Sequence, residues 1–316
     1  MIKKNDILTA DALIKNYIHR TPVLTNQSLN QILQTKLFFK CENFQKVGAF
    51  KIRGATNAVF SLSQEEMKNG VATHSSGNHA AALTLAAKWR KIPARVVMPK
   101  TSPQVKINAV KNYGADITFC EPNQQAREAA LDKIVRDTHA KFIHPYNNEK
   151  IIAGQSTAAL ELLQDHNDLD FLIAPVGGGG LISGTALTCH YFFPKIKVIG
   201  AEPKGADDAY RSMQENRIVP SENPQTIADG LLTSLGNLTF PIIKEKVARI
   251  FTAEEASIIQ AMRYVWERMK IIIEPSSAVP LAIILENKKF FQNKKIGIII
   301  SGGNVELGNL PFEISK

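Results

Sequence analysis

The sequence predicts an α/β protein whose sheets are mostly parallel and covered by helices. Short runs rich in β-branched and aromatic residues alternate with longer runs whose apolar residues recur at helical spacing. The runs at 170–176 and 295–301 are apolar without a polar alternate, as is typical of central strands covered on both faces. With 316 residues, the chain reaches the size at which one core usually divides, so we expect two domains.

The other elements follow from the same two patterns. Further strands are predicted at 37–40, 95–99, 115–120 and 197–202, and helices at 79–91, 124–140 and 254–270. Pro280 falls inside one more apparent helix, after EPSSAV, and should kink or break it. In an open parallel sheet, ligands are expected at the carboxyl ends of the strands.

Composition excludes several classes of protein. The net charge of +9 comes from lysines and arginines scattered along the chain, without a basic arm, so we expect no nucleic-acid partner. We also expect a cytoplasmic protein without a membrane partner, because no run approaches the roughly 20 apolar residues of a span and the start lacks a secretory signal. Cys41, Cys120 and Cys189 are odd in number and far apart, which predicts reduced thiols packed in the core.

Four consecutive glycines, Gly177 to Gly180, lie between a predicted strand and a predicted helix. A backbone without Cβ atoms can curl around an anion and direct N–H groups at it, and the positive helix end adds attraction. The run matches neither GxGxxG nor GxxxxGK[ST], so a phosphate monoester fits better than a dinucleotide or a triphosphate. A plain tight turn is the alternative.

Two polar turns extend this pattern. Ser75, Ser76, Gly77 and Asn78 form a small polar turn before a helix, where amides and hydroxyls suit a carboxylate and the Asn78 amide suits a phenolic oxygen. An ordinary helix N-cap is equally compatible with that turn. Ser301 ends the strand at 295–301, where its hydroxyl could face a heterocycle, although SGGN also forms turns.

Lys51, in GAFKIRG, completes the set. A lysine beside a phenylalanine is usually just solvated. Together with the glycine run and the two polar turns, however, Lys51 predicts a lysine that holds pyridoxal phosphate.

At these segments the chain resembles the fold type II (tryptophan synthase β-like) pyridoxal phosphate enzymes, and within them the serine racemase and serine/threonine dehydratase group. THSSGNHA, IAGQSTAALEL, PVGGGGLISG, AEPKGADDAY, IEPSSA and SGGNVEL are similar to serine racemase segments in the same order. The resemblance implies a large cofactor-binding domain at 1–67 and 147–316, a small mobile substrate-binding domain at 68–146, and a homodimer.

The resemblance also implies a role for each site residue. Lys51 would form the Schiff base with pyridoxal phosphate, and Ser301 would meet the pyridine nitrogen. The other cofactor contacts would be Phe50, Asn78, Gly177, Gly178, Gly179, Gly180 and Leu181, and the substrate contacts Ser75, Ser76, Gly77, Asn78, His79 and Arg127. A serine at the pyridine nitrogen does not hold it firmly protonated, which favours elimination and reprotonation over transamination.

These roles predict a serine racemase that also eliminates water and ammonia from L-serine, L-threonine or 3-hydroxyaspartate, giving a 2-oxo acid. Lys51 would take the α-proton as a general base. Ser76 would act on the opposite face, where threonine dehydratases typically carry alanine. One alternative is a threonine or threo-3-hydroxyaspartate ammonia-lyase with little racemase activity. Another is a non-catalytic protein that binds pyridoxal phosphate or an amino acid.

Arg127 and Tyr146 bear on the choice of substrate. Arg127 matches an arginine near the substrate in serine racemases and could bind a second carboxylate, although a solvated helix charge is equally compatible with the sequence. Tyr146 stands where the animal enzymes have asparagine. The sequence therefore does not rank serine, threonine and 3-hydroxyaspartate.

Acidic residues in AEPKGADD form a further candidate site. By themselves they indicate ordinary solvated charges. The resemblance to the serine racemase divalent site implies Glu202, the Ala206 carbonyl and Asp208 as metal ligands. An oxygen-only set suits Mg²⁺, Ca²⁺ or Mn²⁺ rather than zinc.

Overall fold

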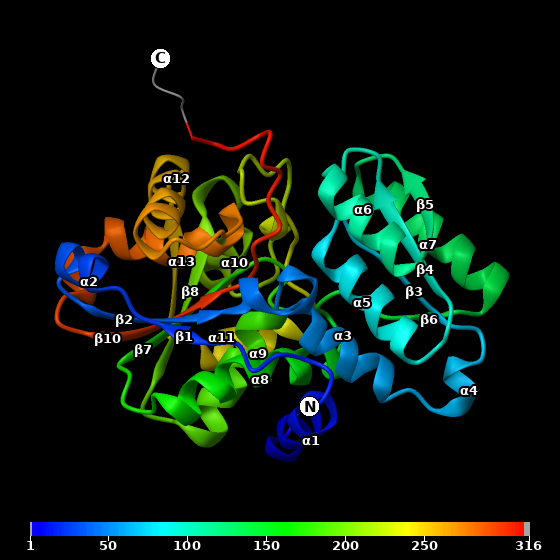
Figure 1. Ribbon diagram of the computed structural model, residues 1–316, viewed down its shortest axis with the longest axis horizontal. Helices are drawn as coiled ribbons and strands as arrows, with labels where there is room; N and C mark the ends of the chain where they lie inside the picture. The colour runs from blue at the N-terminus through cyan, green and yellow to red at the C-terminus, as the bar shows by residue number, and fades with distance from the viewer. Residues whose placement is uncertain (1, 313–316) are drawn as a thin grey trace.

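Two sheets organise the molecule, and helices lie on both sides of each (Figure 1). The computed structural model describes residues 2–312. The larger sheet has the order β1-β2-β10-β7-β8-β9 and the smaller one the order β5-β4-β3-β6. All neighbouring strands are parallel except β1 and β2, which are antiparallel. The predicted α/β class with mostly parallel sheets is confirmed.

The strands of the larger sheet come from both ends of the chain. They are β1 (Val23–Leu24), β2 (Lys36–Cys41), β7 (Phe171–Pro175), β8 (Lys197–Pro203), β9 (Arg249–Ala253) and β10 (Lys295–Ile300). The smaller sheet contains β3 (Val71–His74), β4 (Ala94–Pro99), β5 (Asp116–Cys120) and β6 (Lys141–Phe142). Its strands therefore lie within the segment predicted as the small domain.

The helices alternate with these strands along the chain. They are α1 (Lys4–Ile14), α2 (Gln27–Leu33), α3 (Lys51–Phe60), α4 (Gln64–Met67), α5 (Asn78–Trp89), α6 (Gln104–Tyr113), α7 (Gln124–Thr138), α8 (Glu149–Asp165), α9 (Gly180–Phe192), α10 (Asp208–Glu215), α11 (Thr239–Lys246), α12 (Glu255–Tyr264), α13 (Pro275–Glu286) and α14 (Lys288–Phe291). In Figure 1, α10, α12 and α13 lie above the larger sheet and α8, α9 and α11 below it.

The apolar pattern explains why β7 and β10 are central. Ile296, Ile298, Ile299 and Ile300 are at most 1% exposed, because helices cover both faces of the sheet. Cys41, Cys120 and Cys189 are free thiols buried in hydrophobic clusters, as predicted. No helix within residues 2–312 is long and apolar enough to span a bilayer.

One helix prediction is wrong in detail, and of the two outcomes expected at Pro280, a kink or a break, the break does not occur. The helix predicted at 254–270 is α-helical only to Tyr264 and continues as a π-helical segment, Val265–Met269, which Lys270 ends in a left-handed conformation. Pro280 lies inside α13 without breaking it. The residues from Ser276 to Ile284 are all buried, so packing against the rest of the fold maintains the helix where proline removes one backbone donor.

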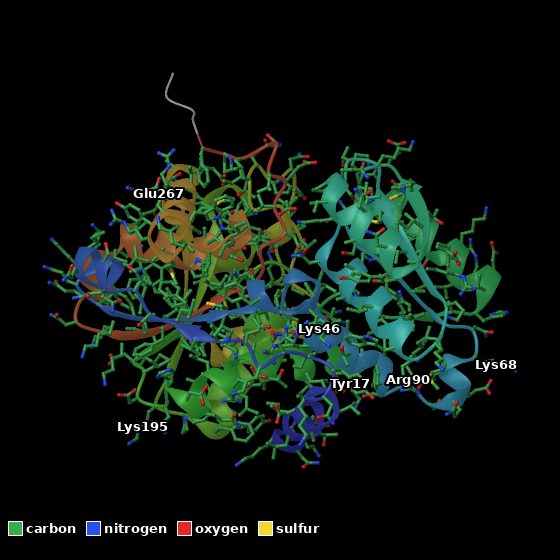
Figure 2. The ribbon with its side chains drawn as sticks, viewed as in Figure 1. Tyr17, Lys46, Lys68, Arg90, Lys195 and Glu267 are labelled. Atoms are coloured by element: carbon green, nitrogen blue, oxygen red, sulfur yellow. The ribbon has the colours of Figure 1, made fainter. Side chains whose placement is uncertain are left out.

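The two sheets are joined through contacts around α3 and α5, which lie side by side (Figure 1). Tyr17 packs on Phe60 and Trp89, with ring centroids 4.3 Å and 5.8 Å apart. The Lys46 amine lies 5.1 Å from the Trp89 ring, and Figure 2 shows Tyr17 and Lys46 along the same junction. Lys51 begins α3 and Asn78 begins α5, so two of the predicted site residues belong to the helices of this junction.

Candidate active site

Lys51 and Ser301 are 250 positions apart in sequence but adjacent in the fold. The backbone N–H of Phe50 donates to the Ser301 carbonyl at 2.9 Å, and Ala49 pairs with Gly302 in an isolated antiparallel bridge. Lys51 begins α3, and Ser301 follows β10 directly. Two of the predicted cofactor contacts are therefore brought together at the carboxyl end of the larger sheet.

The Lys51 amine is held in a poorly solvated position. Its Nζ donates to the Pro145 carbonyl at 3.1 Å and lies 5.2 Å from the centroid of the Phe50 ring. Burial lowers the pKa of Lys51 to about 8, against a smaller opposite effect of the Glu274 carboxylate. An amine with this pKa is partly neutral near physiological pH and can accept a proton.

A buried ion cluster fixes the helix that begins at Lys51. Arg53 is completely buried and donates to Glu42 at 2.7 Å and to Glu161 at 2.8 Å. Lys40 also bonds Glu161, at 2.5 Å. Because the charges of this cluster are paired, it holds α3 in place without exposing a polar group.

The glycine run forms a cradle that side chains would fill. A Cβ atom on Gly178 would lie 2.4 Å from the ring of Tyr146, and one on Gly180 would lie 3.0 Å from the same residue. Gly179 has φ 87°, which glycine adopts most easily. Within residues 2–312, no backbone carbonyl accepts from the first amides of α9, from Gly180 and Leu181, so they are available to an anion.

The polar turn SSGN follows β3 in the smaller sheet. Gly77 is the residue that precedes α5, and no side chain caps that helix. Ser75 accepts from the Gly77 N–H at 3.2 Å, whereas the Ser76 hydroxyl makes no hydrogen bond within the part of the chain that the structure describes. The turn SSGN therefore does not act as an ordinary side-chain N-cap of α5, which was the alternative interpretation of its sequence.

Asn78 belongs to a polar network that spans both sheets. Its Nδ2 donates to Oε1 of Glu274 at 2.8 Å, and its Oδ1 accepts from Asn304 at 2.9 Å. Lys106, on α6, forms an ion pair with Asp229 and lies 3.8 Å from Glu274. One hydrogen of the Asn78 amide remains for the predicted phenolic oxygen.

The charges of this network perturb one another. Burial raises the pKa of Glu274 to about 7, and Lys106 is the main group that opposes this rise. The pKa of Lys106 is raised by Glu274 and Asp229, although burial acts in the opposite direction with the largest single effect. Sequence analysis missed Lys106, Asp229 and Glu274, since nothing in their local sequence indicates a partner from another segment.

Two neutral imidazoles lie near Lys51. Burial lowers the pKa of His79 well below its usual value and that of His144 to about 4, and the Lys51 charge lowers both further. Nδ1 of His144 accepts from the backbone N–H of Asn147 at 2.9 Å, so its proton is on Nε2. His79, predicted as a substrate contact, is thus a buried neutral group beside the lysine.

Arg127 and Tyr146 lie close enough to affect each other electrostatically. Arg127 lies on α7, is half-buried, and has a buried Nε without a hydrogen-bond partner in residues 2–312. Burial raises the pKa of the Tyr146 phenol, while Thr233 and, more weakly, Arg127 lower it. A side chain on the substrate could therefore meet a guanidinium and a phenol together.

The comparisons with known proteins agree with this geometry. Residues 14–302 match the family described as "Pyridoxal-phosphate dependent enzyme". The chain belongs to this family. It is 51% identical over 307 residues to the beta-hydroxyaspartate dehydratase of Paracoccus denitrificans (strain Pd 1222), and the match covers 97% of this chain and 98% of that protein.

Solved structures extend the likeness. The serine racemase of Dictyostelium discoideum has a TM-score of 0.92 at 52% identity, covering 97% of this chain and 99% of its own. The processed form of threonine deaminase isoform 2 from Solanum lycopersicum has a TM-score of 0.90 at 30% identity, covering 97% and 92%. The protein is therefore a fold type II pyridoxal phosphate enzyme, which confirms the predicted fold, the predicted pyridoxal phosphate and the enzymatic nature.

The site fits the family's cofactor. The first amides of α9 and the glycine cradle suit its phosphate, the Lys51 amine suits its aldehyde carbon, and the buried Ser301 hydroxyl suits its ring nitrogen. The individual residue assignments remain predictions.

The acidic pair Glu202 and Asp208 is buried, so the expectation of solvated charges is wrong. Glu202 accepts from the N–H groups of Ala209 and Tyr210 at 2.9 Å and 2.8 Å. Burial raises the pKa of Asp208 to about 7, and neither of its carboxylate oxygens makes a well-formed hydrogen bond within residues 2–312. Two buried carboxylates beside the Ala206 segment fit a hard divalent cation.

Proposed function

We propose that this protein is a serine racemase that also catalyses α,β-elimination from hydroxy amino acids. The observation that carries the proposal is the combination of a Lys51 amine of lowered pKa with a Ser76 hydroxyl that neither caps a helix nor forms a hydrogen bond in residues 2–312. The 52% identity to a serine racemase of the same fold supports it.

When bound, pyridoxal phosphate withdraws electrons from the α-carbon of an amino acid and so acidifies its hydrogen. In our proposal, Phe50 and Asn78 position the ring, Gly177 to Gly180 with Leu181 hold the phosphate, and Ser301 meets the ring nitrogen. Ser75, Ser76, Gly77, Asn78 and His79 surround the substrate carboxylate, because this turn offers amides and hydroxyls ahead of a helix.

Lys51 and Ser76 move the protons. Lys51 removes the α-hydrogen as a neutral amine, and Ser76 supplies a hydrogen from the other face, which inverts the α-carbon. Of these two residues elimination needs only Lys51, because Lys51 can return the proton that it took from the α-carbon to the β-hydroxyl, which then leaves as water. Later hydrolysis releases ammonia and a 2-oxo acid.

A second candidate is a threo-3-hydroxyaspartate ammonia-lyase with little racemase activity. The unpaired Nε of Arg127, near Tyr146, favours it, because a guanidinium binds a second carboxylate in a fixed orientation. The relative of 51% identity is a beta-hydroxyaspartate dehydratase.

The proposal includes Mg²⁺, Ca²⁺ or Mn²⁺ bound by Glu202, the Ala206 carbonyl and Asp208. It also includes a mobile domain at 68–146 that closes on the domain formed by 1–67 and 147–316, which would exclude water from the reacting carbon. A homodimeric, cytoplasmic enzyme belongs to the same proposal, on the resemblance to serine racemases.

The variant Ser76→Ala tests the proposal. D-serine and pyruvate are measured from L-serine, and oxaloacetate from both enantiomers of threo-3-hydroxyaspartate. We expect Ser76→Ala to lose D-serine formation and to keep pyruvate formation. Ser75→Ala is the comparison variant: Ser75 accepts from the Gly77 amide in the same proposed carboxylate site, so its loss should lower D-serine and pyruvate formation together. Undiminished D-serine formation by Ser76→Ala would contradict the role of Ser76, and a wild-type enzyme that forms only oxaloacetate would establish the second candidate.

A further inference from the structure

Asn304 lies in the SGGN turn after β10, and its side-chain amide contacts two other segments of the site. Its Nδ2 donates to the Val47 carbonyl at 2.7 Å and to Oδ1 of Asn78 at 2.9 Å. Val47 belongs to the turn that precedes Lys51 and α3, and Asn78 begins α5. One amide group therefore links the segment before Lys51 to the residue that we assign to the phenolic oxygen of the cofactor.

Both hydrogens of the Asn304 amide are used in these contacts. An asparagine amide has two hydrogens on its nitrogen, and its oxygen only accepts. A backbone carbonyl also only accepts, so the nitrogen of Asn304 has to face Val47, and its second hydrogen is left for Asn78. If the Asn78 amide were turned over, two amide nitrogens would face each other at this contact. The oxygen of Asn78 is therefore held towards Asn304.

This contact also fixes the direction of the Asn78 nitrogen. Its Nδ2 donates one hydrogen to Oε1 of Glu274 at 2.8 Å, and the other hydrogen has no partner among the residues that the structure describes. Glu274 alone would not fix the amide. Burial raises the pKa of Glu274 to about 7, so near neutral pH part of this carboxyl is protonated and can donate to an amide oxygen as well as accept from an amide nitrogen. The Val47 carbonyl, which directs Asn304, carries no such proton.

The backbone at Val47 is shaped for its contact with Asn304. Val47 has φ 58° and ψ 11°, a left-handed conformation that a β-branched residue rarely adopts. The SGGN turn holds this conformation through the Asn304 amide and through the Gly303 N–H, which donates to the Gly48 carbonyl at 2.9 Å. A Cβ atom on Gly48 would lie 2.6 Å from Oδ1 of Asn304. Strained backbone of this kind persists where its surroundings hold it, and it is frequent at functional sites.

We propose that Asn304 is a positioning residue that holds the Asn78 amide in one orientation, so that a hydrogen of Asn78 is directed to the phenolic oxygen of pyridoxal phosphate. This inference rests on the proposed function, in which Asn78 contacts the cofactor. A hydrogen bond donated to the phenolic oxygen favours its ionised form. An amide turned over would place its own oxygen there and favour the protonated form.

Absorption spectra of the reconstituted holoenzyme test this inference, because bound pyridoxal phosphate has separate bands for an ionised and a protonated phenolic oxygen. We expect Asn304→Ala to raise the share of the protonated band and to weaken cofactor binding about fivefold, as for one lost hydrogen bond. Asn304→Asp should change both readouts in the same direction. Because alanine adds no charge, a change in Asn304→Asp alone would be an effect of the added charge and would overturn the role of Asn304.

Asn43→Ala and Asn43→Asp are the matched controls. Asn43 packs against the same turn, since a Cβ atom on Gly303 would lie 3.1 Å from its Cβ, but its Nδ2 donates to the Ile272 carbonyl at 3.1 Å. Both variants should leave the two bands and the cofactor affinity unchanged, and changes as large as those of the Asn304 variants would overturn the inference. The melting temperature of each variant without cofactor reports structural loss separately.

A shorter side chain keeps the test available should Asn304→Ala fail to fold. Asn304→Ser retains one hydroxyl, which has a single hydrogen to donate and cannot serve both partners. We expect this variant to raise the share of the protonated band as well. An unchanged band ratio in Asn304→Ser and Asn304→Asp together would overturn the role of Asn304.

A double variant separates this inference from the assignment on which it rests. If Asn304 acts through Asn78, Asn304→Ala changes the bands no further in a protein that already carries Asn78→Ala, whereas additive changes would overturn the positioning role. If Asn78→Ala shifts the bands and the Asn304 variants do not, the role of Asn304 is overturned while that of Asn78 stands. If Asn78→Ala also leaves the bands in place, the assignment of Asn78 to the phenolic oxygen is wrong, and the inference from it is wrong as well.

Discussion

Replacing Lys106 by methionine should destabilise the protein more at high pH than at low pH. The Lys106 side chain is only 6% exposed and forms ion pairs with Asp229 and Glu274. Methionine keeps most of the apolar stem, which packs against Gly77, and removes the charge. The variant therefore isolates the electrostatic contribution of this contact between the two sheets.

The expected size follows from the distance and from the pKa of Glu274. Two unit charges 3.8 Å apart interact by about 4 kcal/mol at an effective dielectric constant of about 20, which is an upper limit here. Burial already raises the folded pKa of Glu274 from 4.5 to about 7, so its carboxylate destabilises the fold increasingly between those pH values and no further above them. Without Lys106 the folded pKa rises again, and the penalty keeps growing above pH 7 by up to about 1.4 kcal/mol per pH unit.

Urea unfolding of the holoenzyme at about pH 6.5 and about pH 8.5 measures this effect. We expect the stability deficit of Lys106→Met to grow by roughly 1–2 kcal/mol between the two conditions. Lys100→Met is the control, because Lys100 pairs with Glu121 on the surface and should change stability by less than about 1 kcal/mol at either pH. An equal deficit for Lys106→Met at both pH values, or none at either, would refute the reasoning.

Two further predictions concern the substrate and the metal. Tyr146→Phe keeps the aromatic ring against Gly178 but removes the phenol hydroxyl beside Arg127. KM for threo-3-hydroxyaspartate should therefore rise about fivefold, with KM for L-serine unchanged. Equal effects on the two KM values would contradict a role of Tyr146 at the second carboxylate. Removing divalent cations with a chelator should lower the melting temperature, by the equivalent of about 2.7 kcal/mol at a metal concentration of 100 Kd. Asp208→Asn should abolish this response, whereas Asp207→Asn should keep it, because Asp207 pairs with Arg211 instead.

The sequence predicts those parts of the fold that a local pattern determines. The runs that become β7 and β10 are apolar without interruption, which only a strand covered on both faces tolerates. Lys51, the glycine run and Ser301 were assigned to one site from their combination and from the family resemblance, and the fold brings the start of α3 next to Ser301 at the carboxyl end of β10. The sequence analysis missed β1 and β6, which have two residues each, too few for any period, and it also missed the short strands β3 and β9.

Residues that act through distant partners carry no such pattern. Lys106 is one of many lysines on amphipathic helices, and only the fold places it beside Asp229 and Glu274. His144 follows the same rule, since its low pKa comes from burial near Lys51 rather than from its sequence neighbours.

The ion pair between the sheets also bears on the chemistry of Lys51. The Glu274 carboxylate raises the pKa of Lys51, while burial lowers it by more. Lys106 in turn lowers the pKa of Glu274 and so keeps this carboxylate partly ionised near pH 7. Lys106 therefore acts on Lys51 through Glu274, and the same contact that joins the two sheets helps to set the pH at which the base is neutral. In Lys106→Met, Glu274 is protonated near pH 7, so the pKa of Lys51 should fall and the acidic limb of the pH profile for elimination should move to lower pH.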